Sequence, residues 1–82
     1  MEFKWNGRYI EQERLILDTT EQICAILNDQ NISRKELAKR LGKSKSYISR
    51  ILDGEKNITL RTLSDILSVL GYRGHFSVRK QK

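Results

Sequence analysis

The sequence predicts a mainly α-helical protein: a small bundle with a long N-terminal helix and a short C-terminal β-strand. Three observations predict this fold. Apolar residues recur at helical spacing in residues 9–28 and 60–70, Ser33, Ser44 and Thr59 stand where helices could begin, and residues 72–79 alternate with a period of two. With 82 residues, the chain is long enough for one domain, residues 1–82, and too short for two.

The N-terminal part is predicted to be a long amphipathic helix preceded by an arm. Residues 1–8 contain Phe3 and Trp5 but no helical pattern, so they form an arm or a short extended piece. The apolar run at residues 15–17 would by itself suit a short buried strand equally well. The surrounding residues favour a helix, because they recur at helical spacing: Tyr9, Ile16, Thr20, Ile23 and Leu27, with Leu15, Thr19 and Ile26 beside them. Cys24, the single cysteine, lies in this stretch and is interpreted as a small buried side chain.

A second helix is predicted to begin after Ser33. Ser33 and Glu36 fit the S-x-x-E capping box, in which the serine accepts a hydrogen bond from the backbone of Glu36 and Glu36 reaches back. Helical spacing places one set of side chains on the inner face: Leu37, Ala38, Leu41 and the stem of Arg34. Gly42 then supplies the left-handed conformation that favours a helix end.

A third helix is predicted from Lys45 to about Leu52, with Ser44 as its cap. At 100° per residue, its polar residues form an arc of about 140° opposite an apolar arc. The polar arc holds Lys45, Ser46, Ser49 and Arg50, and the apolar arc holds Tyr47, Ile48, Ile51 and Leu52. One side of this helix therefore packs, and the other is free to contact a partner.

The C-terminal third is predicted to contain a fourth helix and a strand. After a turn-rich loop at residues 53–57, Thr59 can cap a helix that ends at Gly71. Its apolar stripe comprises Leu60, Leu63, Ile66, Leu67 and Leu70, which completes a bundle over residues 9–71. Tyr72, Gly74, Phe76 and Val78 then alternate with Arg73, His75, Ser77 and Arg79, as in a half-buried strand over residues 72–79. His75 is interpreted as a solvent-facing strand residue rather than a pH switch.

The excess of positive over negative charge lies in residues 33–50. This segment holds seven basic residues and one acidic residue, and therefore carries the whole formal net charge of +6; the remaining chain holds nine of each. Such a local excess indicates a polyanion-binding surface, for which DNA is the leading candidate.

Other classes of function find no support in the sequence. One histidine and one cysteine, far apart, offer no metal site and no nucleophile–base pair, and a Gly-rich phosphate loop is absent. We therefore expect neither an enzyme nor a cofactor. No apolar run approaches the roughly 18 residues that span a bilayer, so we expect a soluble, cytoplasmic protein without a membrane partner.

Residues 34–54 resemble the helix-turn-helix of the phage-repressor-like regulators called the XRE family. Ala38 is small where two helices would cross, Gly42 suits the turn, and apolar residues lock the second helix onto the first: Leu37, Leu41, Ile48 and Ile51. The LAKRLG string and the core-and-surface alternation at Ile48-Ser49-Arg50-Ile51 carry the resemblance, which continues to about Gly71. It implies a central helix-turn-helix at residues 34–53.

The resemblance also implies where DNA would bind. The helix from Lys45 would lie in the major groove, with Lys45, Ser46, Ser49 and Arg50 facing bases. Phosphates would be contacted by Arg34, Lys43, Ser44, Tyr47, Lys56 and Asn57. For Tyr47, a role in the core is an equal alternative, because it stands at the edge of the apolar arc.

Three functions are compatible with the sequence. The first is a sequence-specific transcriptional repressor that binds double-stranded DNA at a palindromic operator as a homodimer. The second is an antitoxin that also neutralises a toxin protein, and the third is an adaptor whose basic face meets an acidic protein. For the dimer, we expect pairing of the C-terminal strand through Tyr72, Phe76 and Val78; the arm around Phe3 and Trp5 and the long first helix are rival elements.

Overall fold

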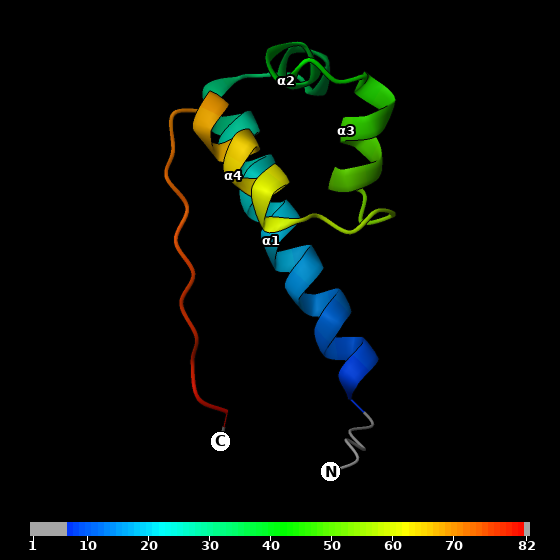
Figure 1. The fold of residues 1–82 in the computed structure, drawn as a ribbon, viewed down its shortest axis with the longest axis vertical. Helices are drawn as coiled ribbons and strands as arrows, with labels where there is room; N and C mark the ends of the chain where they lie inside the picture. Colours follow the sequence, from blue (N-terminus) through cyan, green and yellow to red (C-terminus); the bar gives the residue numbers. More distant parts are fainter. Residues whose placement is uncertain (1–6, 82) are drawn as a thin grey trace.

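The computed structural model describes residues 7–81 and is mainly helical, as predicted (Figure 1). It contains the helices α1 (Arg8–Gln30), α2 (Arg34–Leu41), α3 (Lys45–Leu52) and α4 (Leu60–Val69). The prediction for the N-terminal arm, with Phe3 and Trp5, falls almost wholly outside the described residues. None of the helices in residues 7–81 is long and apolar enough to cross a membrane.

The hydrophobic core lies where the C-terminal half of α1 meets the other three helices. Helix α2 packs against α3 and α4, and α1 packs against α3. The buried apolar side chains are Ile23, Leu27, Leu37, Ala38, Ile48, Ile51, Leu52, Ile66 and Leu70. The one buried polar residue in the described chain, Thr20, donates its hydroxyl hydrogen to the carbonyl oxygen of Leu17 at 3.1 Å. Thr20 therefore satisfies its hydrogen-bonding need within its own helix.

Three predicted helix caps are confirmed. The hydroxyl oxygens of Ser33, Ser44 and Thr59 each accept a hydrogen bond from the backbone N–H three residues further on, at 3.0, 3.0 and 3.1 Å. Each bond satisfies one of the free N–H groups that a helix start leaves. These local bonds explain why α2, α3 and α4 begin where the sequence predicts.

Helix α1 extends well beyond the bundle. Its buried residues, Thr20, Ile23 and Leu27, all lie in its C-terminal half, whereas Tyr9 is 70% exposed. Figure 1 shows the N-terminal half of α1 projecting past the other helices. The predicted helical spacing is therefore correct, but only part of the predicted apolar face has a partner within the described chain.

The predicted C-terminal β-strand is wrong. Residues 72–81 form an outstretched segment, and residues 7–81 contain no strand (Figure 1). A strand needs a neighbouring strand for its backbone hydrogen bonds, and this part of the chain offers none. The segment is held near its start instead: Tyr72 N–H donates to the carbonyl oxygen of Leu67 at 2.8 Å. At Gly74 a Cβ atom would lie 2.7 Å from Leu67 Cδ1, so glycine allows the segment to pass close to α4.

Candidate nucleic-acid interface

The turn between α2 and α3 is set by backbone geometry. Gly42 has φ 68° and ψ 32°, in the left-handed region, where glycine has no steric penalty. The N–H groups of Gly42 and Lys43 donate to the carbonyl oxygens of Lys39 and Ala38, at 3.2 and 2.9 Å. Ser44 then caps α3 immediately. The direction of α3 relative to α2 is therefore determined within three residues.

Helix α3 has a buried face and an outer face. Ile48, Ile51 and Leu52 are buried against the core, to which α2 contributes Leu37 and Ala38. On the outer face, Lys45, Ser46 and Arg50 are exposed and Ser49 is partly exposed. All four residues predicted to face bases thus lie on one accessible face of α3, with Ser49 at its edge.

Tyr47 lies between two lysines. Lys43 Nζ lies 5.3 Å from the centroid of the Tyr47 ring and Lys56 Nζ lies 5.7 Å from it, both within cation–π range. Lys56 is brought there because its backbone N–H, like that of Glu55, donates to the carbonyl oxygen of Arg50. Tyr47 is half-buried and packs against the core. Tyr47 therefore packs against the core and has two lysines beside its ring, while its contact with phosphate stays a prediction.

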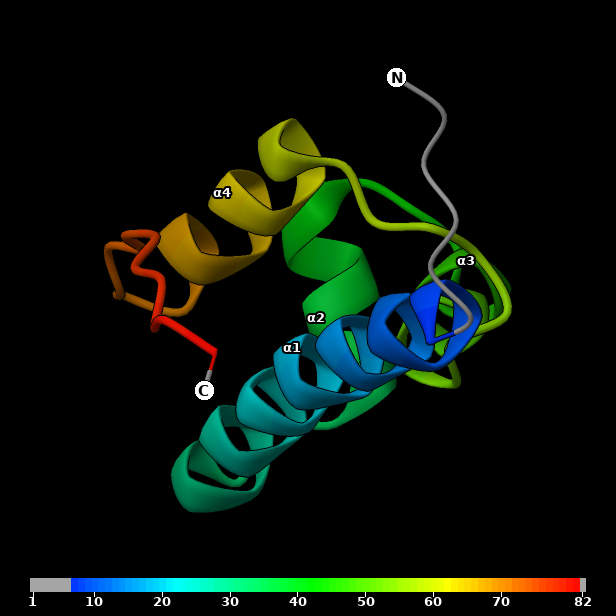
Figure 2. The same ribbon diagram turned by 90° about the horizontal axis from the view of Figure 1, so that it is seen from below.

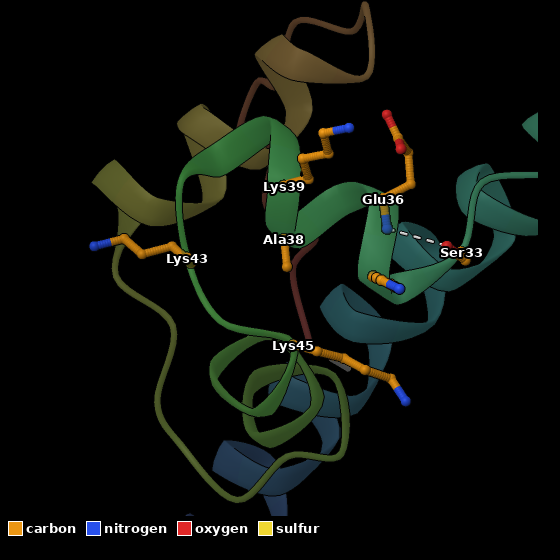
Figure 3. Close-up of a pocket in the computed structure, with 7 residues that line it drawn as sticks. Ser33, Glu36, Ala38, Lys39, Lys43 and Lys45 are labelled. Carbon is orange, nitrogen blue, oxygen red and sulfur yellow. Dashed lines mark hydrogen bonds between the residues drawn. The ribbon is translucent and has the colours of Figure 1, made fainter.

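An open hollow lies where α2 meets the start of α3 (Figure 3). It measures about 470 Å³ and is lined by Ser33, Lys35, Glu36, Ala38, Lys39, Lys43 and Lys45. In Figure 3 the labelled lysines spread outward from the hollow in different directions. Lys35 and Lys39 were not among the residues predicted to contact DNA. They stand four residues apart on the polar face of α2, and this spacing places both on the side of the helix that lines the hollow.

Two of the seven cations in residues 33–50 form ion pairs. Arg34 Nη1 lies 3.1 Å from Asp53 Oδ1, which joins the start of α2 to the end of α3. Arg40 Nε donates to Glu36 at 3.1 Å, so the Glu36 carboxylate binds this arginine rather than completing the predicted capping box. Five cations have no ion-pair partner in residues 7–81: Lys35, Lys39, Lys43, Lys45 and Arg50. These five cations lie on α2, in the turn and on α3.

The described residues contain no candidate metal-binding site. Residues 7–81 contain no group of three or more His, Cys, Asp and Glu side chains that could hold a metal ion. Cys24 is a free thiol that packs against the core and is partly buried, whereas the sequence predicts a buried side chain.

Comparison with known families agrees with this geometry. A family model described as helix-turn-helix matches residues 25–75, which is more than half of the chain. The matched part runs from the C-terminal end of α1 through α4 and leaves out most of α1 and residues 76–81. Comparisons with curated proteins and with solved structures give no significant match.

Proposed function

The chain belongs to the XRE-type helix-turn-helix family of DNA-binding transcriptional regulators, and from this premise we propose that it is a dimeric repressor of a palindromic operator. The observation that carries the proposal is the outer face of α3, where Lys45, Ser46 and Arg50 are exposed beside further lysines that have no ion-pair partner in residues 7–81. Repression needs nothing beyond occupancy of the operator, because a bound dimer obstructs access to the DNA.

Base reading is assigned to the outer face of α3. With this helix in the major groove, Lys45 and Ser46 at its start reach base edges, and Arg50 lies one turn further along. The planar fork of arginine can donate to both O6 and N7 of guanine, so Arg50 is the principal candidate reader. Ser49, at the edge of the face, adds a hydroxyl that can donate or accept.

Phosphate binding is assigned to the residues around this face. Lys43 and Lys56 flank Tyr47, and their ammonium groups are held 5.3 and 5.7 Å from its ring centroid. Two positioned cations on one side of α3 would fix its register along the backbone. Ser44 and Asn57, in the adjacent turns, and Arg34, at the start of α2, complete the proposed phosphate contacts.

Removal of these lysines should change how binding depends on salt. We expect Lys43→Ala and Lys56→Ala each to weaken binding to specific and random duplexes alike, and to lower the slope of log K against log salt by about one unit. The measurement is a salt titration of the affinity by fluorescence anisotropy. Arg14→Ala removes the same charge from α1, outside the proposed DNA-contacting residues, and serves as the control. An Arg14 effect as large as the lysine effects would show that net charge alone governs binding.

The proposed dimer follows from the size of one reading surface. One helix contacts only a few base pairs, so a specific site requires two copies, with half-sites about 34–36 Å apart. A two-fold pair of chains then matches a palindrome.

Selection of bound duplexes from a random library tests the proposal. We expect one palindromic sequence to be enriched and to bind at least about a thousandfold more tightly than scrambled duplexes at physiological salt. Equal affinity for the selected and scrambled sequences would overturn base reading and favour an adaptor whose basic face binds polyanions in general.

A further inference from the structure

The projecting half of α1, together with the next turn as far as Glu21, carries an apolar and acidic surface. At about 100° per residue, one arc of about 120° holds the residues of this surface, here called the helix patch: Tyr9, Ile10, Glu13, Leu17 and Glu21. Its three apolar side chains are between 54% and 70% exposed. Tyr9 continues the line of Leu27, so the patch prolongs the buried face of α1 beyond the point where the bundle covers it.

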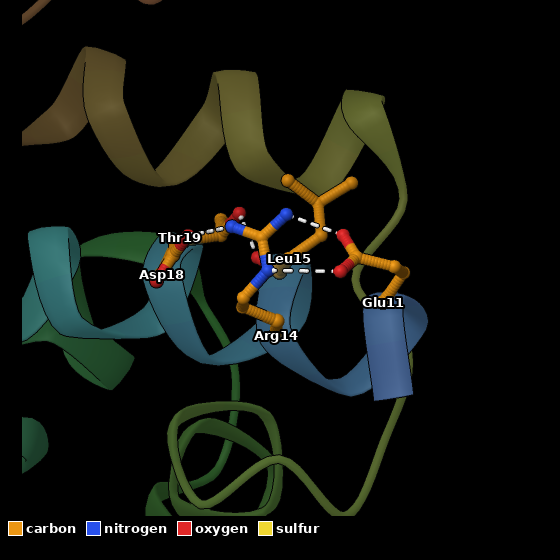
Figure 4. Close-up of polar contacts among 5 residues, drawn as sticks. All are labelled: Glu11, Arg14, Leu15, Asp18 and Thr19. Atoms are coloured by element: carbon orange, nitrogen blue, oxygen red, sulfur yellow. Dashed lines mark hydrogen bonds and ion pairs between the residues drawn. The ribbon is translucent and has the colours of Figure 1, made fainter. Parts of the chain in front are cut away.

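The acidic residues of the helix patch differ from their neighbours on α1. The Arg14 guanidinium forms an ion pair with Glu11, and its Nη1 atom lies 3.5 Å from Asp18 Oδ2 (Figure 4). The negative charges of these two carboxylates are therefore balanced within the helix. The hydrogen bond and the charge of Glu11 raise the pKa of the Arg14 guanidinium, which keeps it charged. Glu13 and Glu21 form no ion pair within residues 7–81. The helix patch therefore exposes uncompensated negative charge beside apolar side chains.

The C-terminal segment, residues 72–81, has the opposite character. Tyr72, Phe76 and Val78 are 46%, 75% and 82% exposed. Arg73, Arg79 and Lys80 stand between and after them, and the segment contains no acidic residue. Within the described chain these three cations form no ion pair. Segment and patch thus match in apolar character and are opposite in charge.

We propose that the C-terminal segment of one protomer docks on the helix patch of a second copy of this chain, and that the second copy returns the same contact. Tyr72, Phe76 and Val78 cover Tyr9, Ile10 and Leu17, while Arg73 and Arg79 approach Glu13 and Glu21. The interface rests on the proposed dimeric function, and it supplies the pair of α3 helices that a palindrome requires.

The two surfaces have similar lengths. Extended chain rises about 3.3 Å per residue, so residues 72–79 span about 23 Å. Helix rises about 1.5 Å per residue, so residues 9–21 span about 18 Å. Two symmetric contacts would bring six aromatic side chains into the interface, and large aromatic side chains dominate the energetics of such contacts.

The C-terminal segment is better placed to contact α1 of a second copy than α1 of its own protomer. Figures 1 and 2 both place the C-terminal segment apart from the N-terminal half of α1 in the same protomer. The start of the segment is fixed to α4, because Tyr72 N–H donates a hydrogen bond to the carbonyl oxygen of Leu67. This bond limits how closely the segment can approach the N-terminal half of α1 in the same protomer. The whole helix patch and the segment beyond residue 75 also lie outside residues 25–75, the part that matches the helix-turn-helix family model.

Charge reversal on each surface separately tests the interface in the absence of DNA. The helix variant carries Glu13→Lys and Glu21→Lys, and the segment variant carries Arg73→Glu and Arg79→Glu. Sedimentation velocity should show a dimer for the wild type, and each variant alone should raise the dimer dissociation constant on the order of a hundredfold. Mixing the two variants in equal amounts should restore a dimer, because opposite charges then meet in both contacts. Asp29→Lys with Asp65→Lys is the control, which reverses two exposed acids elsewhere and should stay dimeric.

Several outcomes would overturn the interface. A monomeric wild type would do so, as would a mixture that stays monomeric while circular dichroism shows both variants folded. A helix variant that remains dimeric would indicate that the segments contact each other rather than α1. The proposed DNA reading fails separately: a dimer that selects no sequence contradicts it and leaves the interface standing, whereas a monomer that selects a sequence contradicts only the interface.

Discussion

Replacing Arg50 with alanine is expected to weaken binding to the selected operator by about 1–3 kcal/mol per half-site, a loss of roughly 5- to 150-fold for each. Binding to random duplexes should fall far less, because a side chain that reads bases contributes little where no matching guanine is present. Lys45→Ala should act in the same direction. The measurement is the ratio of the two affinities at one fixed salt concentration, since the salt changes both.

Arg50→Lys provides the matched control. It keeps the positive charge and replaces the planar fork with a single ammonium group, so it should retain affinity for random DNA and lose much of the preference for the operator. The carbonyl oxygen of Arg50 accepts the hydrogen bonds from Glu55 and Lys56, and neither substitution removes that backbone group. If Arg50→Ala weakened specific and random binding equally, Arg50 would be a phosphate contact and not a base reader.

The helices could be predicted because their determinants are local. Ser33, Ser44 and Thr59 cap through bonds that reach only three residues along the chain, and Gly42 ends α2 by its own conformation. The same holds for the outer face of α3, since helical spacing alone decides which residues share it. The proposed base-reading residues therefore follow from the sequence almost completely.

Features that depend on distant segments were not predictable in the same way. Leu60 fits the apolar stripe of α4, yet it is 78% exposed, and Tyr9 is exposed at the other end of the chain. Spacing shows which residues share a face, but it does not show how far the neighbouring helices extend along that face. The alternation at residues 72–79 likewise describes an extended segment without showing whether a neighbouring strand exists. The position of Lys56 beside Tyr47 depends on the loop returning to the end of α3.

A large loss of stability is expected for Ile48→Ala. Ile48 is 0% exposed and lies on the inner face of α3, so truncation leaves a cavity where α3 meets the rest of the core. Such a change typically lowers the free energy of unfolding by about 2–5 kcal/mol. Because small domains have only about 5–15 kcal/mol of stability, this loss is a large fraction of the total. Thermal unfolding followed by circular dichroism should show a fall in Tm of at least about 10 °C.

Two further variants serve as controls in this experiment. Leu60→Ala truncates an exposed aliphatic side chain, and Ile48→Val makes a smaller change at the buried position. Leu60 is also aliphatic and helical, but it is exposed, so its truncation should change the free energy of unfolding by less than about 0.5 kcal/mol. Ile48→Val removes one methylene and should cost about 0.5–1.5 kcal/mol. Equal losses for Leu60→Ala and Ile48→Ala would contradict the arrangement of α3 and α4 described above. Below its Tm, Ile48→Ala should still prefer the operator over random DNA, because the outer face of α3 is unchanged and the core only holds that face in position.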